Sequence, residues 1–429
     1  MTDEHHAVAP PSLCDAAHGQ DARPEHPSAY YFGLVAFTFF VIIVGGGLPT
    51  PFYVVYQHLW GFSPAILTVV FAAYAGGLLL TLVLFRTVSD RVGRKRVLIA
   101  GVVVGITSTA VFLTAQSVEW LIVARVLSGV SVGLTASTAT AALTEFEPSG
   151  DRKRAARYVA LITAVGVGIG PFYAGILLQY APDPLTLSFW VLFVLLLGAL
   201  VATLLLSEGP RLWRPTPPDR HGVFHIPPTI RSTFYLSALA AFVGFALAGI
   251  FSALAPSFLA ENLHITNHAV GGATVLLMFG SAACAQLAFA GKDRLFVARL
   301  GGALVPAGLA VISVAVGTGL APLFFGGTIV CGAGFGLCLT GGLGLLNQVA
   351  PSERRAEVLS AFYVAGYLGL SVPVVGVGLL ANDYGLAPAV AIFAVIISAL
   401  AVPVILGLGS AGPPRSAVPA GPSVSTGRG

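Results

Sequence analysis

The sequence predicts an all-α integral membrane protein, with twelve transmembrane helices in two six-helix repeats. Three observations favour this fold class. Of the 429 residues, 56% are hydrophobic and only 9% are charged, whereas a soluble domain carries about 25% charged residues. The apolar residues form separate stretches of bilayer-spanning length, and special residues of the first half recur in the second half at one offset. An ordinary soluble protein and a disordered chain are therefore excluded, and four cysteines in 429 residues cannot form a disulfide scaffold.

The two ends of the chain are polar. Residues 1–29 are rich in Pro and His and lack the pattern of a secretory signal, and residues 410–429 have no periodicity. We expect both to be disordered cytoplasmic tails. Between them, each helix needs roughly 20 residues to cross a bilayer core of about 30 Å. The expected spans are 31–56, 64–86, 97–116, 119–146, 155–180, 187–207, 231–258, 268–290, 296–315, 321–349, 356–381 and 387–409.

The basic residues support twelve spans and set the orientation. With an even number of spans both tails lie on one side, and every Lys and Arg except Arg125 then falls in a tail, in a loop on that side, or at the helix end next to such a loop. The loops concerned are 86–96, 152–157, 211–231, 292–299 and 354–355. Because basic residues are retained in short cytoplasmic loops, we expect both termini to be cytoplasmic in a multi-pass protein of the inner membrane.

A proline-rich segment divides the chain. Residues 208–230 contain six prolines, which prevent a helix, so we expect a cytoplasmic linker between an N-terminal half (30–207) and a C-terminal half (231–409). At an offset of 203 residues, Asp90-Arg91 coincides with Asp293-Arg294, and Gly175 coincides with Gly378. Parallel repeats of six helices are the architecture of rocking transporters, which bind their substrate near the midplane between the halves.

The loop after the second span reads Asp90-Arg91-Val92-Gly93-Arg94-Lys95. This run resembles the Asp-Arg-x-Gly-Arg-Arg/Lys loop motif of the major facilitator superfamily, although Arg86 stands where the family usually has glycine. The resemblance covers about residues 30 to 408 and implies alternating access by a monomer. It also implies an inner gate, which we assign to Asp90, Arg91, Gly93, Arg94, Glu145, Asp293 and Arg294, with Glu145 paired to Arg94. The alternative is that these charges serve only as a topology signal.

The fourth span contains Arg125-Val-Leu-Ser-Gly129, which is similar to the family's Arg-x-x-x-Gly motif. An intramembrane Arg costs at least about 2.5 kcal/mol to insert, so it should face protein or water. The alternative is that Arg125 snorkels to the outer surface. Because the predicted membrane interior contains no carboxylate, we assign coupling or substrate binding to Arg125, with His58 and Glu119 as substitute proton carriers.

The fifth span contains Gly166-x-x-x-Gly170-Pro171-x-x-x-Gly175. The pattern resembles the antiporter motif of the family's twelve-helix drug:proton antiporters, and it is the residue-level argument for export. Spaced glycines allow close helix contact, and Pro171 removes a backbone donor. Ordinary small-residue packing is the alternative.

The cavity is expected to be lined by polar and aromatic side chains of the central helices, each of which could instead bond a neighbouring backbone carbonyl. The candidates are Tyr53, Gln57, Thr135, Thr138, Tyr173, Asn347, Tyr363 and Tyr367. Aromatic side chains with few fixed charges suit bulky amphipathic or aromatic substrates.

Together these features predict a secondary active transporter that exports small amphipathic or drug-like compounds by proton antiport. One alternative is an importer or exchanger of small organic anions, with Arg125 holding a carboxylate. Another is a non-transporting sensor that keeps the carrier fold. We expect the lipid bilayer, a small-molecule substrate and protons as partners, and no cofactor, metal, nucleic acid or enzymatic activity, since no nucleophile is paired with a membrane-embedded His or acid.

Overall fold

The computed structural model describes residues 28–84, 92–206, 226–351 and 354–407. Its described part is helical, without β-strands, and it contains twelve helical segments long and apolar enough to cross a membrane, which confirms the predicted number and order. The helices are α1 (Ser28–Gly47), α2 (Phe52–Trp60), α3 (Pro64–Leu84), α5 (Arg94–Leu113), α6 (Val118–Glu145), α7 (Arg152–Tyr180), α8 (Leu187–Leu204), α9 (Arg231–Asn262), α10 (His268–Ala288), α11 (Arg294–Thr318), α12 (Ala321–Val349), α13 (Arg355–Tyr384) and α14 (Leu386–Leu406), with a short 3-10 turn, η3 (Pro228–Ile230), before α9.

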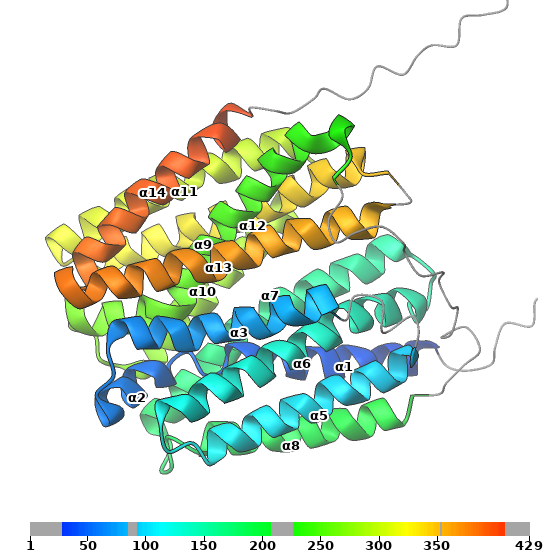
Figure 1. Ribbon diagram of the computed structural model, residues 1–429, viewed down its shortest axis with the longest axis horizontal. Coiled ribbons are helices and arrows are strands. Elements are labelled where there is room, and N and C mark those ends of the chain that lie inside the picture. Colours follow the sequence, from blue (N-terminus) through cyan, green and yellow to red (C-terminus); the bar gives the residue numbers. More distant parts are fainter. Residues whose placement is uncertain (1–27, 85–91, 207–225, 352–353, 408–429) are drawn as a thin grey trace, which may run out of the picture.

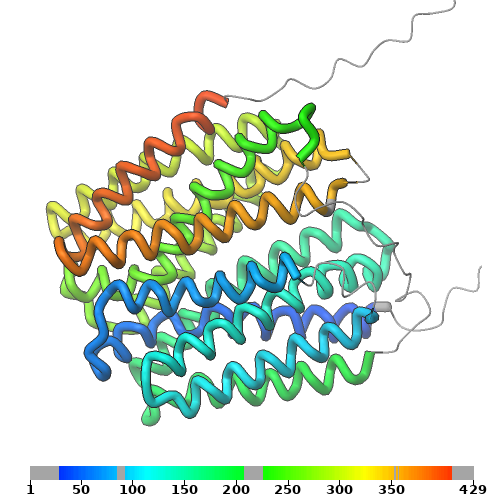
Figure 2. Tube along the Cα trace, in the orientation of Figure 1, coloured from blue at the N-terminus to red at the C-terminus, as the bar shows by residue number. Residues whose placement is uncertain are grey.

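The helices form two bundles that lie side by side (Figure 1). The first six spans, from α1 to α8, make one bundle, and the last six, from α9 to α14, make the other, as the colours of Figure 2 show. The expected tails and most of the expected linker lie outside the described residues. Because successive spans reverse direction, Ser28 and Leu406 lie at the same end of the bundle. We call this the terminal end, and the opposite end, at Trp60 and Tyr180, the far end.

Glycines bring helices of one half into close contact, and the repeat reproduces the arrangement. A Cβ added at Gly129 of α6 would lie 2.1 Å from the Tyr74 carbonyl oxygen of α3. At the corresponding position of the second repeat, a Cβ at Gly332 of α12 would lie 2.3 Å from the Met278 carbonyl oxygen of α10. Such distances leave room only for hydrogen, so these glycines permit the backbones to touch.

Side chains cap several helix ends. The Asp151, Asn267 and Asp293 carboxylate or amide oxygens accept hydrogen bonds from backbone N–H groups in the first turns of α7, α10 and α11. These bonds satisfy donors that have no partner within the helix. At the other ends of α2, α11 and α14, Gly61, Gly319 and Gly407 adopt positive φ, which stops each helix.

The turn between α6 and α7 is organised by Glu147. Its Oε2 accepts hydrogen bonds from the Ser149 N–H (2.8 Å), the Ser149 hydroxyl (2.6 Å) and the Asp151 N–H (2.9 Å). Arg154 lies 3.6 Å from the other carboxylate oxygen. The Ser149 hydroxyl bond, assisted by the backbone donors and Arg154, lowers the pKa of Glu147. The charged carboxylate therefore stabilises this turn at the terminal end.

The first span is not the continuous helix expected over residues 31–56. The structure ends α1 at Gly47 and restarts at Phe52 in α2. Pro49 and Pro51 lack the N–H groups that would continue the helical bonds, and the Thr50 N–H donates to the Gly47 carbonyl at 3.2 Å. In a continuous helix the Thr50 N–H would donate to the Gly46 carbonyl oxygen, but here it donates to Gly47 instead. Its carbonyl oxygen is left available to another group.

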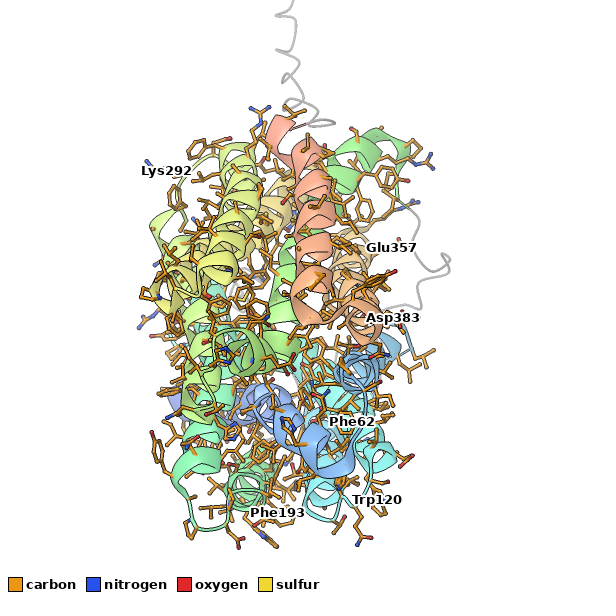
Figure 3. All side chains as sticks on the ribbon, turned by 90° about the vertical axis from the view of Figure 1, so that its left-hand side faces the viewer. Phe62, Trp120, Phe193, Lys292, Glu357 and Asp383 are labelled. Atoms are coloured by element: carbon orange, nitrogen blue, oxygen red, sulfur yellow. The ribbon has the colours of Figure 1, made fainter. Side chains whose placement is uncertain are left out.

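The two halves are joined by hydrogen bonds at the far end. Within the described part of the chain, the side-chain bonds between the halves link Ala65 to Asn382, Tyr180 to Asn267, and Gln179 to His268. Figure 3 views this end, with Phe62 labelled on the first half and Asp383 on the second. We call the boundary between the two halves the seam. In this conformation the far end is closed.

Candidate functional site

Arg125 of α6 is the buried charge around which the candidate site is built. Its side chain is only 1% exposed. One terminal nitrogen donates to the Gly46 carbonyl oxygen at 2.8 Å. This is the carbonyl that the break between α1 and α2 releases, so a local feature of the first span creates the partner of a side chain in the fourth. Arg125 does not snorkel to the surface.

Aromatic rings surround the guanidinium. Its central carbon lies 4.6 Å from the centroid of the Tyr74 ring of α3 and 5.8 Å from those of Phe71 and Tyr53. Such cation–π contacts stabilise a desolvated guanidinium by up to about 2 kcal/mol each. Among the described residues, no carboxylate pairs with Arg125, and its Nε has no hydrogen-bond partner. The buried Tyr53 hydroxyl also has none.

The second half presents aromatic rings of its own. The Tyr367 ring of α13 lies 5.3 Å from the Phe245 ring of α9, and Phe245 lies 5.6 Å from Phe335 of α12. Helix α13, which carries Tyr367, packs against α3 of the first half, which carries Tyr74. We define the central site as Tyr53, Phe71, Tyr74 and Arg125 of the first half together with Phe245, Phe335 and Tyr367 of the second.

The sequence identified only part of this site. Tyr53, Arg125 and Tyr367 were expected, and Tyr363 lies one helical turn before Tyr367 in α13. Phe71, Tyr74, Phe245 and Phe335 were missed. Phenylalanine and tyrosine are common in membrane helices, so without the interhelical contacts nothing in the local sequence distinguishes a ring at the site from one that faces lipid.

Other cavity candidates lie elsewhere. Thr135 packs against Gly101 of α5, and the Thr138 hydroxyl donates to the Leu134 carbonyl within its own helix. The Tyr173 hydroxyl donates to the Ser188 carbonyl of α8 at 2.5 Å. These contacts are internal to the first half. Gln57 is half-buried in α2, and Asn347 is exposed near the terminal end of α12.

The residues assigned to an inner gate form contacts within each half. Arg94, which follows Gly93 at the start of α5, forms an ion pair with Glu145 at the end of α6. In the second half, the Asp293 carboxylate accepts from the Phe296 N–H at 2.8 Å. The Arg294 side chain packs against Gly344 of α12. Asp90 and Arg91 lie outside the described residues.

The glycine motif of α7 has two contact faces. A Cβ at Gly170 would lie 2.4 Å from the Val44 carbonyl oxygen, so this face packs on α1. Gly166 packs on the same helix, against Ile43. A Cβ at Gly175 would instead lie 2.5 Å from the His268 carbonyl oxygen of the other half. The Pro171 carbonyl oxygen similarly approaches Gly272 of α10.

The two substitute proton carriers lie at the far end and not beside Arg125. Glu119 accepts a hydrogen bond from the Ser117 hydroxyl in the first turn of α6. His58, near the end of α2, is exposed, and α2 contacts α9 of the second half, whose last turn contains Glu261. The structure therefore places His58 on a helix that contacts the second half, whereas the hydrogen-bond partner of Glu119, Ser117, belongs to its own half.

The family follows from a match over most of the chain. Residues 35–374 match the model of the Major Facilitator Superfamily. This protein belongs to that superfamily. Membership establishes a multi-pass transporter that works in a lipid bilayer on a small-molecule substrate, and it agrees with the fold.

Several superfamily members resemble the chain in part or in fold. The quinolone resistance protein NorA of Staphylococcus aureus is 25% identical over 143 residues, which are 33% of this chain and 37% of NorA. The chain thus matches little more than a third of NorA's length. A putative metabolite transport protein of Escherichia coli, YaaU, is 32% identical over 96 residues, which are 22% of this chain and 21% of that protein.

Solved structures of superfamily transporters share the fold over nearly the whole chain. A bacterial homologue of the human lysosomal transporter Spinster, in an inward-facing and unoccupied conformation, has a TM-score of 0.72 at 16% identity and covers 91% of this chain and 99% of its own. The nucleoside transporter NupG has a TM-score of 0.70 at 14% identity, covering 88% and 99%.

Proposed function

We propose that this transporter exports small aromatic, amphipathic compounds across the inner membrane in exchange for protons, with both termini in the cytoplasm. The observation that carries the proposal is the central site. Rings of the first half surround the buried Arg125, and the second half adds the Phe245–Tyr367 ring pair on α9 and α13, of which α13 packs against α3. A substrate between the halves would stack on rings from both sides, and each half could release it when the halves rock apart. The partial similarity to NorA, a quinolone resistance protein, supports export of aromatic compounds.

The direction of transport is proposed from the α7 motif. Gly170 packs on α1, while Pro171 and Gly175 contact α10 across the seam. The motif thus lies where the far end closes, as expected of a helix that seals the outer side while the terminal side loads substrate. The inner gate would act at the opposite end, where the Arg94–Glu145 ion pair ties α5 to α6. For proton coupling we favour His58 over Glu119, because α2, which carries His58, contacts α9 of the other half.

A second candidate is import or exchange of small organic anions. It rests on the unpartnered Nε of Arg125 and on the absence of a carboxylate beside Arg125 in the described part of the chain. A guanidinium pairs with carboxylates in a bidentate geometry, so a carboxylate ligand would supply what the site lacks.

Efflux from cells separates the two candidates. Cells expressing the chain are preloaded with ethidium, a lipophilic cation, or with nalidixic acid, an aromatic carboxylate, and retention is measured with and without a protonophore. The variants are Arg125→Ala, Arg125→Lys and, as a matched control, Lys292→Ala, which removes an exposed charge at the terminal end. All are compared at equal membrane abundance.

Export of either compound that is lost in Arg125→Ala and with protonophore, but kept in Lys292→Ala, supports proton-coupled export through the central site. Net uptake of nalidixic acid that requires Arg125 would select the anion carrier instead. No substrate-dependent flux of any compound from a well-expressed chain would favour the sensor that has kept the carrier fold.

A further inference from the structure

Two amide side chains cross the seam at the far end. The Gln179 Oε1, near the end of α7, accepts a hydrogen bond from the His268 N–H at the start of α10, at 2.9 Å. The Asn382 Oδ1, near the end of α13, accepts from the Ala65 N–H in the first turn of α3, at 3.3 Å. In each case one half supplies the amide and the other half supplies the backbone donor.

The two bonds are one contact repeated. Ala65 and His268 are 203 residues apart, and so are Gln179 and Asn382, which is the offset of the internal repeat. The fifth span of each half therefore caps the second span of the other half. Since each bond is made by corresponding residues of the two repeats, the pair forms a two-fold arrangement about the seam.

The chemistry of these partners is complementary. The first N–H groups of a helix have no acceptor within the helix, and the start of a helix carries a partial positive charge. An amide oxygen accepts the hydrogen bond from such an N–H group, and its partial negative charge lies next to the partial positive charge of the helix start, although the amide carries no net charge. Ala65 and His268 would otherwise have to find water or another acceptor for these N–H groups when the halves meet.

The glycines beside the amides make the contact tight. Gly175 lies four residues before Gln179, and Gly378 lies four residues before Asn382. A Cβ at Gly175 would meet the His268 carbonyl oxygen at 2.5 Å, and one at Gly378 would meet the Thr68 Oγ1 at 2.0 Å. Each amide therefore stands one helical turn beyond a position where the backbone of its helix touches the other half.

We propose that Gln179 and Asn382 are paired gate residues that hold the far end closed during the transport cycle. Both bonds span the two halves, so both must break when the far end opens, and they stabilise only conformations in which it is closed. The inference rests on the alternating access proposed above. We call these two hydrogen bonds the latch. They join uncharged groups, and they lie at the end opposite the Arg94–Glu145 ion pair.

Spin-label distances in the purified full-length chain test this without a substrate. In a chain without its native cysteines, one label pair at Asp183→Cys and Thr266→Cys reports on the far end, where both positions are exposed. A second pair at Arg157→Cys and Leu287→Cys reports on the terminal end. Each pair is measured in Gln179→Met and Asn382→Leu, which remove the acceptor, and in Gln179→Glu and Asn382→Asp, which keep an acceptor oxygen.

We expect the ratio of far-end-open to far-end-closed molecules to rise about 2- to 10-fold in Gln179→Met and in Asn382→Leu, since each loses one hydrogen bond. The double variant should show the product of the two effects, because the sites are well separated. The terminal-end distance should shorten in the same proportion of molecules. Gln179→Glu and Asn382→Asp should match the native chain or favour closure further.

The latch is refuted if the acceptor-free variants keep the native distance distribution, or if the acceptor-keeping variants change it equally. A misfolded variant would broaden both distance distributions, which distinguishes it from a shifted equilibrium. Because no substrate is present, failure to find an exported compound would count against the proposed function and leave this measurement unaffected.

Discussion

Replacing Gly175 by alanine should open the far end. Its Cβ would lie 2.5 Å from the His268 carbonyl oxygen of the other half. Ordinary carbon–oxygen contacts begin near 3.4 Å, so α7 and α10 must separate locally by about 0.9 Å. Overpacking of this kind costs about 1–3 kcal/mol, and the cost falls on the closed conformation alone. The ratio of far-end-open to far-end-closed molecules should therefore rise about 5- to 150-fold.

The assay is the far-end distance between labels at Asp183→Cys and Thr266→Cys, with two alanine controls. Gly76 of α3 has no atom within 4 Å of an added Cβ, so Gly76→Ala should leave the distance unchanged. Gly129→Ala places a Cβ 2.1 Å from the Tyr74 carbonyl within one half. Gly129→Ala should therefore lower the melting temperature but leave the ratio of far-end-open to far-end-closed molecules unchanged. An unchanged distance in Gly175→Ala, or equal opening in Gly129→Ala, would refute this reasoning.

Three further predictions concern the central site, the terminal end and the α6–α7 turn. Tyr74→Leu should reduce transport about 2- to 30-fold by removing the ring closest to Arg125, whereas Tyr74→Phe should retain it; initial rates at equal abundance check this. Exchanging the charges of Arg94 and Glu145 should restore the transport lost in either single reversal, and failure to do so would argue against a direct pair. Folding lowers the pKa of Glu147, so its stabilisation is complete above the unfolded value of about 4.3 and is lost as the pH falls through the folded pKa. The difference in melting temperature between the native chain and Glu147→Gln should therefore shrink on acidification, and a difference independent of pH would contradict the assignment.

The number and order of the spans were predictable from the sequence, because bilayer insertion depends on the local density of apolar residues. The break in the first span was not predicted, although Pro49 and Pro51 provide a signal for it. A long apolar stretch is long enough to cross the bilayer whether it forms one continuous helix or two helices separated by a break. The consequence of the break, an available carbonyl at Gly46, required knowing that Arg125 lies beside it.

The candidate site was predictable only where a residue is unusual in a membrane. A lone intramembrane Arg is costly, so Arg125 was identified from its sequence alone. Tyr74 and Phe245 are ordinary in such helices, and only the packing of α3, α9 and α13 brings them to the central site. Thr135, although polar and in the same helix as Arg125, faces α5.

The sequence by itself determined the membrane class, the twelve spans, the repeat and the position of the buried charge, because each depends on composition or spacing along the chain. The tertiary structure decided which groups meet: the carbonyl that receives Arg125, the rings that surround it, and the amides of Gln179 and Asn382 that cross the seam. These contacts join residues between 51 and 317 positions apart. No local pattern encodes such pairings, since the contacts of Arg125 depend on how the helices of the first half pack, and those of Gln179 and Asn382 depend on how the two halves meet.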